Sequence, residues 1–341
     1  TYHLPPTTYH LPPTTYHPIP IYFCPRMAET STTLKFAAID IGSNAVRCQI
    51  SSVLLYEGTY TFKKLEYVRY PLRLGEDVFA TGRISERRAE KLSQFLHAMK
   101  LLMAVHDVDA YRICATSAMR SSENGRDVAA DIRRKLRMKI DIIDGEAEAA
   151  YVDRILKAVL ADGRHYLHID VGGGSTEFNL YIDRVKVAAQ SFEIGSIRRL
   201  QAADDEMRAT WEAMKAWVKQ NARAHHVSRA IGTGGNIGKI YDMAHRTPGQ
   251  PIFRRQIEEI HGRLAAMTVD ERVRLALLNP DRADVIVPAA HIYLKAMQWA
   301  RIESMLVPDV GLKDGILQAL LEEHLGAAMS DYQLAVAAQT W

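Results

Sequence analysis

The chain has 341 residues, 24% of them charged, and a formal net charge of +3 at pH 7. This slight positive balance is compatible with an anionic substrate but does not argue for one, and we expect no DNA or RNA partner. No apolar run approaches the roughly 18 residues that a membrane-spanning helix needs, so no membrane partner is expected. The three cysteines have neither disulfide nor metal-site spacing, which favours a reducing, cytoplasmic location.

The N-terminal segment is a short proline-rich repeat. The sequence TYHLPPT of Thr1–Thr7 recurs at Thr8–Thr14 and begins again at Thr15. Such a repeat cannot build a core, so we expect residues 1–33 to form a disordered extension. It also lacks the basic start and the apolar stretch of a secretory signal, and Met27 is typical of a translation start.

The folded part begins with an apolar run that ends at an aspartate and a glycine turn. The apolar residues 36–39 precede Asp40, and Gly42, Ser43 and Asn44 follow before a second, alternating apolar run begins. This order predicts strand, turn and strand. Because glycine lacks a Cβ atom, backbone N–H groups in such a turn can approach an anion closely. Asp40 and this turn are therefore candidates for phosphate binding.

The next elements are a strand at 60–68, a turn at 74–77 and a helix that Ser85 caps. A strand at 110–115 then leads into a stretch of small and hydroxyl residues, where Arg120 is a candidate for gripping a phosphate bidentately. Taken alone, this arginine is better explained as a surface residue.

A strand at 140–143 and a glycine turn open a helix that carries Glu146 and Glu148. Carboxylates are common at the start of a helix, because they lie at the positive end of the helix dipole. Glu148, however, lies near the predicted crossing between two halves of the chain, where it can polarise a water for attack on phosphorus. Glu146 points to a different face, so only Glu148 is a candidate catalytic residue.

The central stretch HIDVGGGSTEF repeats the pattern seen at the start. Asp170 ends one predicted strand, a glycine loop follows, and Glu177 lies on the next strand. A glycine loop alone is equally typical of a sharp hairpin, but two copies about 130 residues apart indicate two related halves that face one phosphate site. The candidates in this second loop are Gly172, Gly173, Gly174 and Ser175.

A third glycine loop follows a predicted strand at 227–231 and contains Gly232, Gly234 and Gly235. It lies at a strand-to-helix junction, where anions bind in α/β folds. From about Arg254 the chain is predicted to be helical. Strands that alternate with helices indicate an α/β fold.

Seven short stretches follow one another along the chain: 39–44, 116–120 with Asn124, Gly145 with Glu148 and Ala149, 169–177, 232–235, 282–284, and Gly311 and Leu312 with Asp314 and Gly315. In this order they resemble the exopolyphosphatase and guanosine pentaphosphate phosphohydrolase (Ppx/GppA phosphatase) family in its short two-domain form. The resemblance implies an actin-like ATPase (ribonuclease H-like) α/β fold, with a phosphate-binding cleft between two domains. Domain I would span residues 34–157 and be completed by a helix at about 312–326, domain II would span 158–311, and 327–341 would be a tail.

The resemblance also implies roles for individual residues. Glu148 matches the family's catalytic base, and Asp170 and Glu177 match its acidic groups at Mg²⁺ or Mn²⁺. The matching phosphate-binding groups are Asp40 with its turn, Arg120 and the loop at 172–175. Two positions depart from the family pattern: Ala147 replaces the first of two adjacent glutamates, and Lys313 replaces an arginine, which keeps the charge but not the planar fork.

The reaction implied by the resemblance is metal-dependent hydrolysis of a terminal phosphoanhydride. Inorganic polyphosphate and guanosine pentaphosphate are the expected substrates. Two alternatives stay open: an ATPase or phosphotransferase with the same fold, and a non-catalytic sensor that binds an alarmone or polyphosphate. The C-terminal helices are candidates for a homodimer interface.

Overall fold

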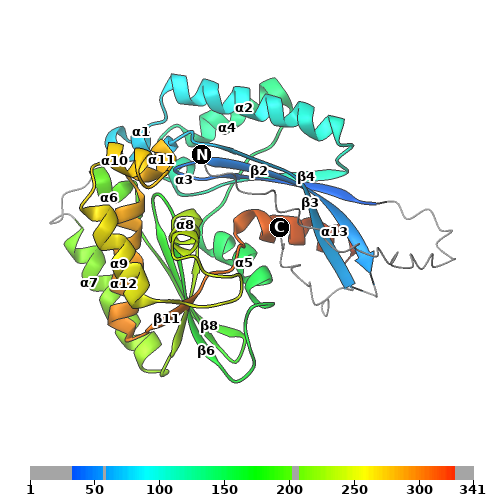
Figure 1. The fold of residues 1–341 in the computed structure, drawn as a ribbon. Coiled ribbons are helices and arrows are strands. Elements are labelled where there is room, and N and C mark those ends of the chain that lie inside the picture. Colours follow the sequence, from blue (N-terminus) through cyan, green and yellow to red (C-terminus); the bar gives the residue numbers. More distant parts are fainter. Residues whose placement is uncertain (1–32, 57–58, 202–206, 327–341) are drawn as a thin grey trace, which may run out of the picture. The chain divides into compact units, whose positions relative to one another are not determined.

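The computed structural model describes residues 33–56, 59–201 and 207–326. The predicted N-terminal extension, apart from Thr33, and the predicted tail at 327–341 lie outside the described residues. Helices and strands alternate along the described chain, and the strands form two sheets (Figure 1). Among the described helices, none combines the length and apolar character that crossing a bilayer requires.

The first sheet has the strand order β3-β2-β1-β4-β5. Strands β1 and β2 form an antiparallel hairpin, β3 extends it, and β4 pairs with β1 in parallel. The strands are β1 (Lys35–Ile41), β2 (Val46–Tyr56), β3 (Thr59–Tyr70), β4 (Ala110–Ala115) and β5 (Asp141–Ile142).

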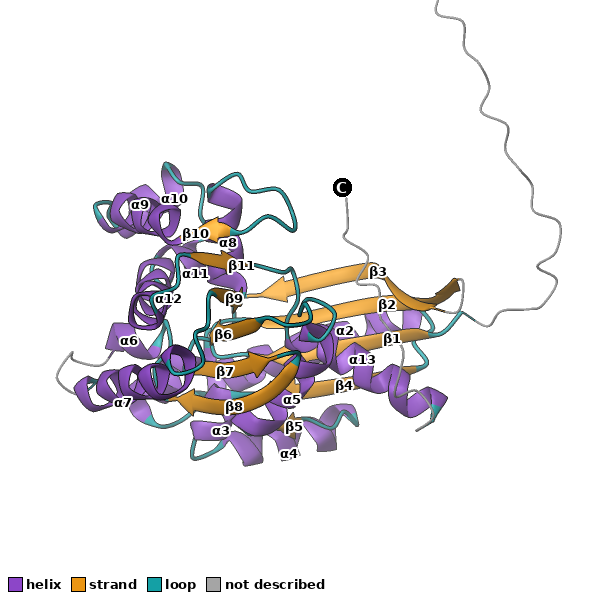
Figure 2. Cartoon of the chain, turned by 90° about the horizontal axis from the view of Figure 1, so that it is seen from below, coloured by secondary structure: helices purple, strands orange, loops and turns teal. Residues whose placement is uncertain are grey.

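The second sheet repeats this topology. Its order is β10-β11-β9-β6-β7-β8, so the run β8-β7-β6-β9-β11 matches β3-β2-β1-β4-β5 strand for strand (Figure 2). The predicted pair of related halves is confirmed. The strands are β6 (His165–Val171), β7 (Thr176–Ile182), β8 (Val185–Phe192), β9 (Arg229–Thr233), β10 (Ile252–Phe253) and β11 (Ser304–Leu306).

Helices cover both faces of each sheet (Figure 2). The first-half helices are α1 (Leu74–Thr81), α2 (Glu86–Val105), α3 (Ser117–Ser121), α4 (Gly125–Leu136) and α5 (Gly145–Leu156). The later helices are α6 (Arg198–Gln201), α7 (Arg208–Val218), the π-helix η1 (Lys219–Arg223), α8 (Gly235–Met243), α9 (Arg254–Ala265), α10 (Val269–Arg274), α11 (Pro280–Ala283), α12 (Ile286–Ala300) and α13 (Leu312–Leu325).

The two-residue period of a strand explains how the central strands are covered. In β1, Ile39 faces the core formed with α2 and α4, whereas Phe36 packs against α13. In β6, Ile169 faces the core formed with α7 and α12, whereas Tyr166 packs against α5. By the same alternation, Asp170 lies on the α5 face of the second sheet.

Two of the predicted elements were wrong. The turn expected at 74–77 is the first part of α1, which begins after Arg73 in a left-handed conformation and buries Leu74 and Val78. The stretch from Arg254 onward is not entirely helical, because β11 is a short strand of the second sheet. Strands of two or three residues are too short for a periodic pattern to be recognised.

Helix α13 packs closely against α5, and Gly315 permits this approach. A Cβ atom at Gly315 would lie within 3.0 Å of the Tyr151 backbone, which cannot move aside as a flexible side chain can. We expect Gly315→Ala to lower the free energy of unfolding by about 1–3 kcal/mol, measured by urea denaturation. Gly262→Ala in α9 is the matched control, because nothing lies within 4 Å and alanine should stabilise the helix by about 0.5–1 kcal/mol. Equal effects of the two changes would contradict this account.

Candidate active site

The two halves place an aspartate at equivalent positions. Asp40 lies near the end of β1 and Asp170 near the end of β6, and each faces a cross-strand partner seven residues later. In the first half the partner is Arg47, whose Nη1 lies 2.7 Å from Asp40 Oδ2. In the second half the partner is Glu177. The repeat thus supplies an ion pair on one side and an acidic pair on the other.

Four carboxylates gather between the sheets: Asp40, Glu148, Asp170 and Glu177. Burial, and then the negative charges of Glu177, Asp170 and Asp40, raise the pKa of Glu148 well above its ordinary value. Burial likewise raises the pKa of Asp170, although a hydrogen bond from the Thr233 hydroxyl opposes this shift. Glu148 therefore lies close enough to Asp170 and Glu177 for their charges to act on it.

The carboxylate of Glu148 has an unsatisfied oxygen. Its Oε2 is buried and has no hydrogen-bond partner, and the Arg120 guanidinium lies 3.8 Å away, beyond hydrogen-bonding distance. Arg120 itself donates to the Ile143 carbonyl oxygen at 2.7 Å, so it is held in the site rather than extended into solvent. Glu146, two residues before Glu148, is exposed, which agrees with the prediction that it points to a different face. A buried oxygen without a partner is costly, and it is free to bind a water or a ligand.

Close packing explains the central glycine loop at least as well as phosphate binding does. A Cβ atom at Gly173 would lie 2.8 Å from Ser43 Cβ, and one at Gly174 would meet Ser117 and Phe79. The loop is therefore pressed against the first half, next to the Asp40 turn. The backbone of Gly195 approaches the same loop, since a Cβ atom added at Gly195 would lie 2.5 Å from the Gly173 carbonyl carbon.

The third glycine loop is positioned beside Asp170. Gly234 has φ +108°, which side-chain-bearing residues rarely adopt, and a Cβ atom there would lie 3.1 Å from Asp170 Oδ1. Gly235 begins α8, so the helix start also lies in this region. Gly232 differs from the prediction of a loop, because it belongs to β9 and packs against Met305 of β11. This close packing accounts for Gly232 without a phosphate.

Two arginines in the site were not singled out as phosphate-binding residues in the sequence. Arg282 Nη2 would lie 3.3 Å and Arg47 Nη2 3.8 Å from a Cβ atom at Gly235, so both guanidinium groups converge on the start of α8. Burial, and next the charge of Arg69, lower the pKa of Arg282. Buried cations that crowd one another favour an anionic ligand. Alignment of the internal repeat would have identified Arg47, because it occupies the position of Glu177.

Glu177 should make the metal-free protein less stable as the pH rises. Burial, and next the charge of Asp170, raise the pKa of Glu177 from 4.5 to about 7. Between these pH values the folded state binds more protons than the unfolded state, so the free energy of unfolding falls with increasing pH. With a chelator present, we expect Glu177→Gln to raise the melting temperature at about pH 8, but much less at about pH 4.5. Each kcal/mol gained in the free energy of unfolding should raise the melting temperature by about 2–4 °C. The same shift at both pH values would contradict the assignment.

Comparison with known protein families decides where the chain belongs. The family model described as the Ppx/GppA phosphatase family matches residues 57–324. The chain belongs to the Ppx/GppA phosphatase family. The resemblance inferred from the sequence is confirmed.

The curated relatives of this Ppx/GppA chain include exopolyphosphatases and a pyrophosphatase. Exopolyphosphatase 2 of Mycobacterium tuberculosis is 27% identical over 321 residues, which cover 84% of this chain and 98% of the relative. Exopolyphosphatase 1 of the same organism is 24% identical over 322 residues, with 87% and 91% covered. A guanosine-5'-triphosphate,3'-diphosphate pyrophosphatase of Aeromonas hydrophila is 22% identical over 297 residues, and the match spans 84% of this chain but 59% of the relative.

Solved Ppx/GppA structures share the fold. The Aquifex aeolicus family member superposes with a TM-score of 0.69 at 24% identity, covering 86% of this chain and 99% of that one. An exopolyphosphatase from Cytophaga hutchinsonii gives a TM-score of 0.72 at 22% identity, covering 85% and 98%. Together with the repeated strand order, this likeness confirms the predicted actin-like α/β fold. The predicted domain boundaries stay a prediction.

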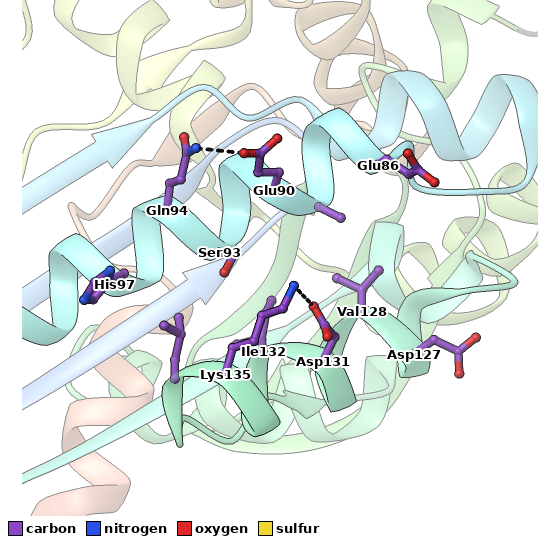
Figure 3. Close-up of a pocket in the computed structure, with 12 residues that line it drawn as sticks. Glu86, Glu90, Ser93, Gln94, His97, Asp127, Val128, Asp131, Ile132 and Lys135 are labelled. Atoms are coloured by element: carbon purple, nitrogen blue, oxygen red, sulfur yellow. Dashed lines mark hydrogen bonds and ion pairs between the residues drawn. The ribbon is translucent and has the colours of Figure 1, made fainter.

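A pocket of about 520 Å³ lies between α2 and α4 (Figure 3), and none of the four clustered carboxylates lines it. Apolar side chains such as Ile132 and charged ones such as Glu86 and Asp131 line it, and Asp131 pairs with Lys135 at 2.6 Å. None of the site residues predicted from the sequence lines this pocket. We therefore place the candidate active site at the carboxylate cluster.

Proposed function

We propose that this chain is a metal-dependent phosphoanhydride hydrolase that releases terminal phosphate from inorganic polyphosphate, with guanosine pentaphosphate as the second candidate substrate. The observation that carries the proposal is the buried, unsatisfied Oε2 of Glu148, which faces an acidic pair and an arginine. A carboxylate in this setting can orient and deprotonate a water. The membership of the Ppx/GppA phosphatase family supports the same chemistry.

The proposed metal ligands are Asp170 and Glu177. No group of three or more His, Cys, Asp or Glu side chains within the described ranges has the geometry of a complete metal site. Mg²⁺ is usually held by one or two carboxylates together with waters and substrate phosphates, and the proposed pair would supply these carboxylates. Burial, and to a lesser extent the charges of Asp40 and Asp170, raise the pKa values of Asp170 and Glu177, so a divalent cation bound there would stabilise their ionised forms. We keep Mg²⁺, with Mn²⁺ as its substitute, as part of the proposal.

In the proposed reaction, Glu148 positions a water in line with the terminal phosphorus and accepts its proton. The pKa of Glu148 falls when positive charge is bound nearby, so the carboxylate is ionised in the loaded site. Arg120 contacts the terminal phosphate, while Arg47, Arg282 and the start of α8 hold the preceding phosphates. When bound, the metal ion supplies charge neutralisation at the leaving phosphoanhydride oxygen.

Polyphosphate is the preferred proposal because the two exopolyphosphatases match along more than nine tenths of their own length, whereas the pyrophosphatase matches along 59%. The arginines and the start of α8 are proposed to bind phosphates, which both substrates contain. The predicted homodimer and cytoplasmic location stay predictions.

The proposal is tested by phosphate release from the full chain with Mg²⁺. Medium-length polyphosphate, guanosine pentaphosphate and ATP are compared side by side at equal concentrations of chain ends. We expect release from polyphosphate, weaker release from guanosine pentaphosphate and little from ATP. If no phosphate is released from any of the three and guanosine pentaphosphate binds tightly, the hydrolase assignment is rejected in favour of the non-catalytic sensor.

A further inference from the structure

A buried polar pair lies one step behind the acidic pair on the second sheet. His168 of β6 and Asn179 of β7 face each other across the strands, as Asp170 and Glu177 do two residues further along. Directly opposed residues point to the same face of a sheet, so both pairs lie on the α5 face. His168 is 1% and Asn179 2% exposed.

The presence of two polar side chains at this buried position requires an explanation. Burying an imidazole and an amide is costly unless each finds hydrogen-bond partners, and an apolar pair would fill the same place without that requirement. The next pair in the same ladder, Tyr166 and Tyr181, is built into an apolar cluster with α5. The polar character is therefore confined to the part of the ladder next to Asp170.

The partners of His168 determine which of its ring nitrogens donates and which accepts. The Asn179 amide nitrogen lies 3.0 Å from His168 Nδ1, and because an amide N–H can only donate, Nδ1 is the acceptor. The proton of the neutral ring then sits on Nε2, which lies 2.9 Å from the Thr233 hydroxyl and donates to it. Thr233 pairs directly with Asp170 in the parallel register of β6 and β9, so the hydroxyl proton of Thr233 is left to donate to the neighbouring Asp170 carboxylate.

We propose that His168 and Asn179 are positioning residues that aim the Thr233 hydroxyl at Asp170 and so hold this carboxylate in the orientation that binds the metal ion. This inference rests on the proposed function, because it assigns the metal to Asp170. We call the chain of hydrogen bonds from Asn179 through His168 and Thr233 to Asp170 the relay. It works only when the ring proton of His168 is on Nε2. If Nδ1 carried the proton, Nε2 would take the Thr233 proton, and Asp170 would lose its donor.

A second contact fixes the other end of the relay. The Tyr293 hydroxyl of α12 accepts from the Val171 N–H at 3.2 Å and donates to the Thr233 carbonyl oxygen. The backbones next to Asp170 and at Thr233 are thus tied to each other. With both backbones held, rotation of the Thr233 hydroxyl is the freedom that remains, and His168 removes it.

The test is the affinity of the metal-free full chain for Mn²⁺, measured by calorimetry without substrate. Removing an outer partner of a metal ligand typically weakens metal binding about 10- to 100-fold. We expect His168→Leu and Thr233→Val each to weaken Mn²⁺ binding at least about 10-fold. His168→Gln, whose amide can still donate to Thr233, and Thr233→Ser, which keeps the hydroxyl, should stay within about threefold of wild type because they preserve the relay.

The double variant His168→Leu with Thr233→Val separates a relay from two independent packing defects. Because both residues act through one hydrogen bond to Asp170, the double variant should bind Mn²⁺ about as weakly as Thr233→Val alone. Tyr181→Phe, a buried hydroxyl removed one pair further along the ladder, is the control and should not change the affinity. If His168→Leu fails to fold, the Thr233→Val and Thr233→Ser pair still tests the relay.

Each outcome decides the proposal. Wild-type affinity in His168→Leu or Thr233→Val, or full additivity in the double variant, overturns the relay. Such a result leaves the hydrolase intact when the wild-type chain still binds Mn²⁺ and releases phosphate. If the wild-type chain binds no Mn²⁺, the metal-dependent function fails and the relay fails with it.

Discussion

Glu148→Gln is expected to fold like the wild-type chain and to lose about 10²- to 10⁴-fold in turnover, the usual worth of a general base. The amide keeps the size of the side chain but cannot accept a proton from water. Folding should not suffer, because burial and three neighbouring carboxylates disfavour the charge that the substitution removes. The measurement is steady-state phosphate release from polyphosphate, with circular dichroism and thermal melting of the same preparations.

Glu146→Gln is the matched control for this prediction. Glu146 lies on the same first turn of α5 but is exposed, so the helix dipole is affected similarly while the site is not. Its turnover should equal that of wild type. Normal turnover in Glu148→Gln, or an equal loss in both variants, would remove Glu148 from the role of base.

Metal removal is the second large effect that we expect. With a chelator, phosphate release should fall by about three orders of magnitude, because neutralisation of transition-state charge by a metal ion is worth several kcal/mol. Added Mg²⁺ or Mn²⁺ should restore it. The carboxylates of Asp170 and Glu177 carry charge that burial makes unfavourable, which is the property expected of residues that bind a cation.

Asp170→Asn connects this effect to a residue. The variant should need at least about 10-fold more Mg²⁺ for half-maximal activity, because one anionic ligand is lost. Asp242→Asn, an exposed residue of α8, is the control and should leave the requirement unchanged. Unchanged activity in the chelator, or an unchanged Mg²⁺ requirement in Asp170→Asn, would contradict a metal held at this position.

The internal repeat made much of the site predictable from the sequence. Asp40 and Asp170 both follow buried apolar runs and precede glycine turns, so one pattern located both strand ends. The convergence of Glu148 was also expected, but only from its place near the crossing between the halves. Its neighbours in space, and the unsatisfied oxygen, depend on how α5 packs against β7 and β8, which periodicity does not describe.

The sequence did not predict why each glycine of these loops is needed. A glycine-rich loop indicates either a phosphate or a close approach of backbones, and the sequence does not separate the two. Gly174 is required by packing against α1 and α3, Gly195 by packing against the loop at 172–175, and Gly234 by its backbone conformation. The His168–Asn179 pair gave no signal, because a histidine and an asparagine in two strands reveal their contact only once the register is known.

Terminal hydrolysis by Glu148 can be followed in a ³¹P NMR time course of medium-length polyphosphate with the full chain and Mg²⁺, with Glu148→Gln in parallel. Orthophosphate should accumulate from the start while interior phosphate signals decline, and Glu148→Gln should leave the spectrum almost unchanged. Short chains that appear before orthophosphate, or the same release by both proteins, would contradict terminal hydrolysis by Glu148.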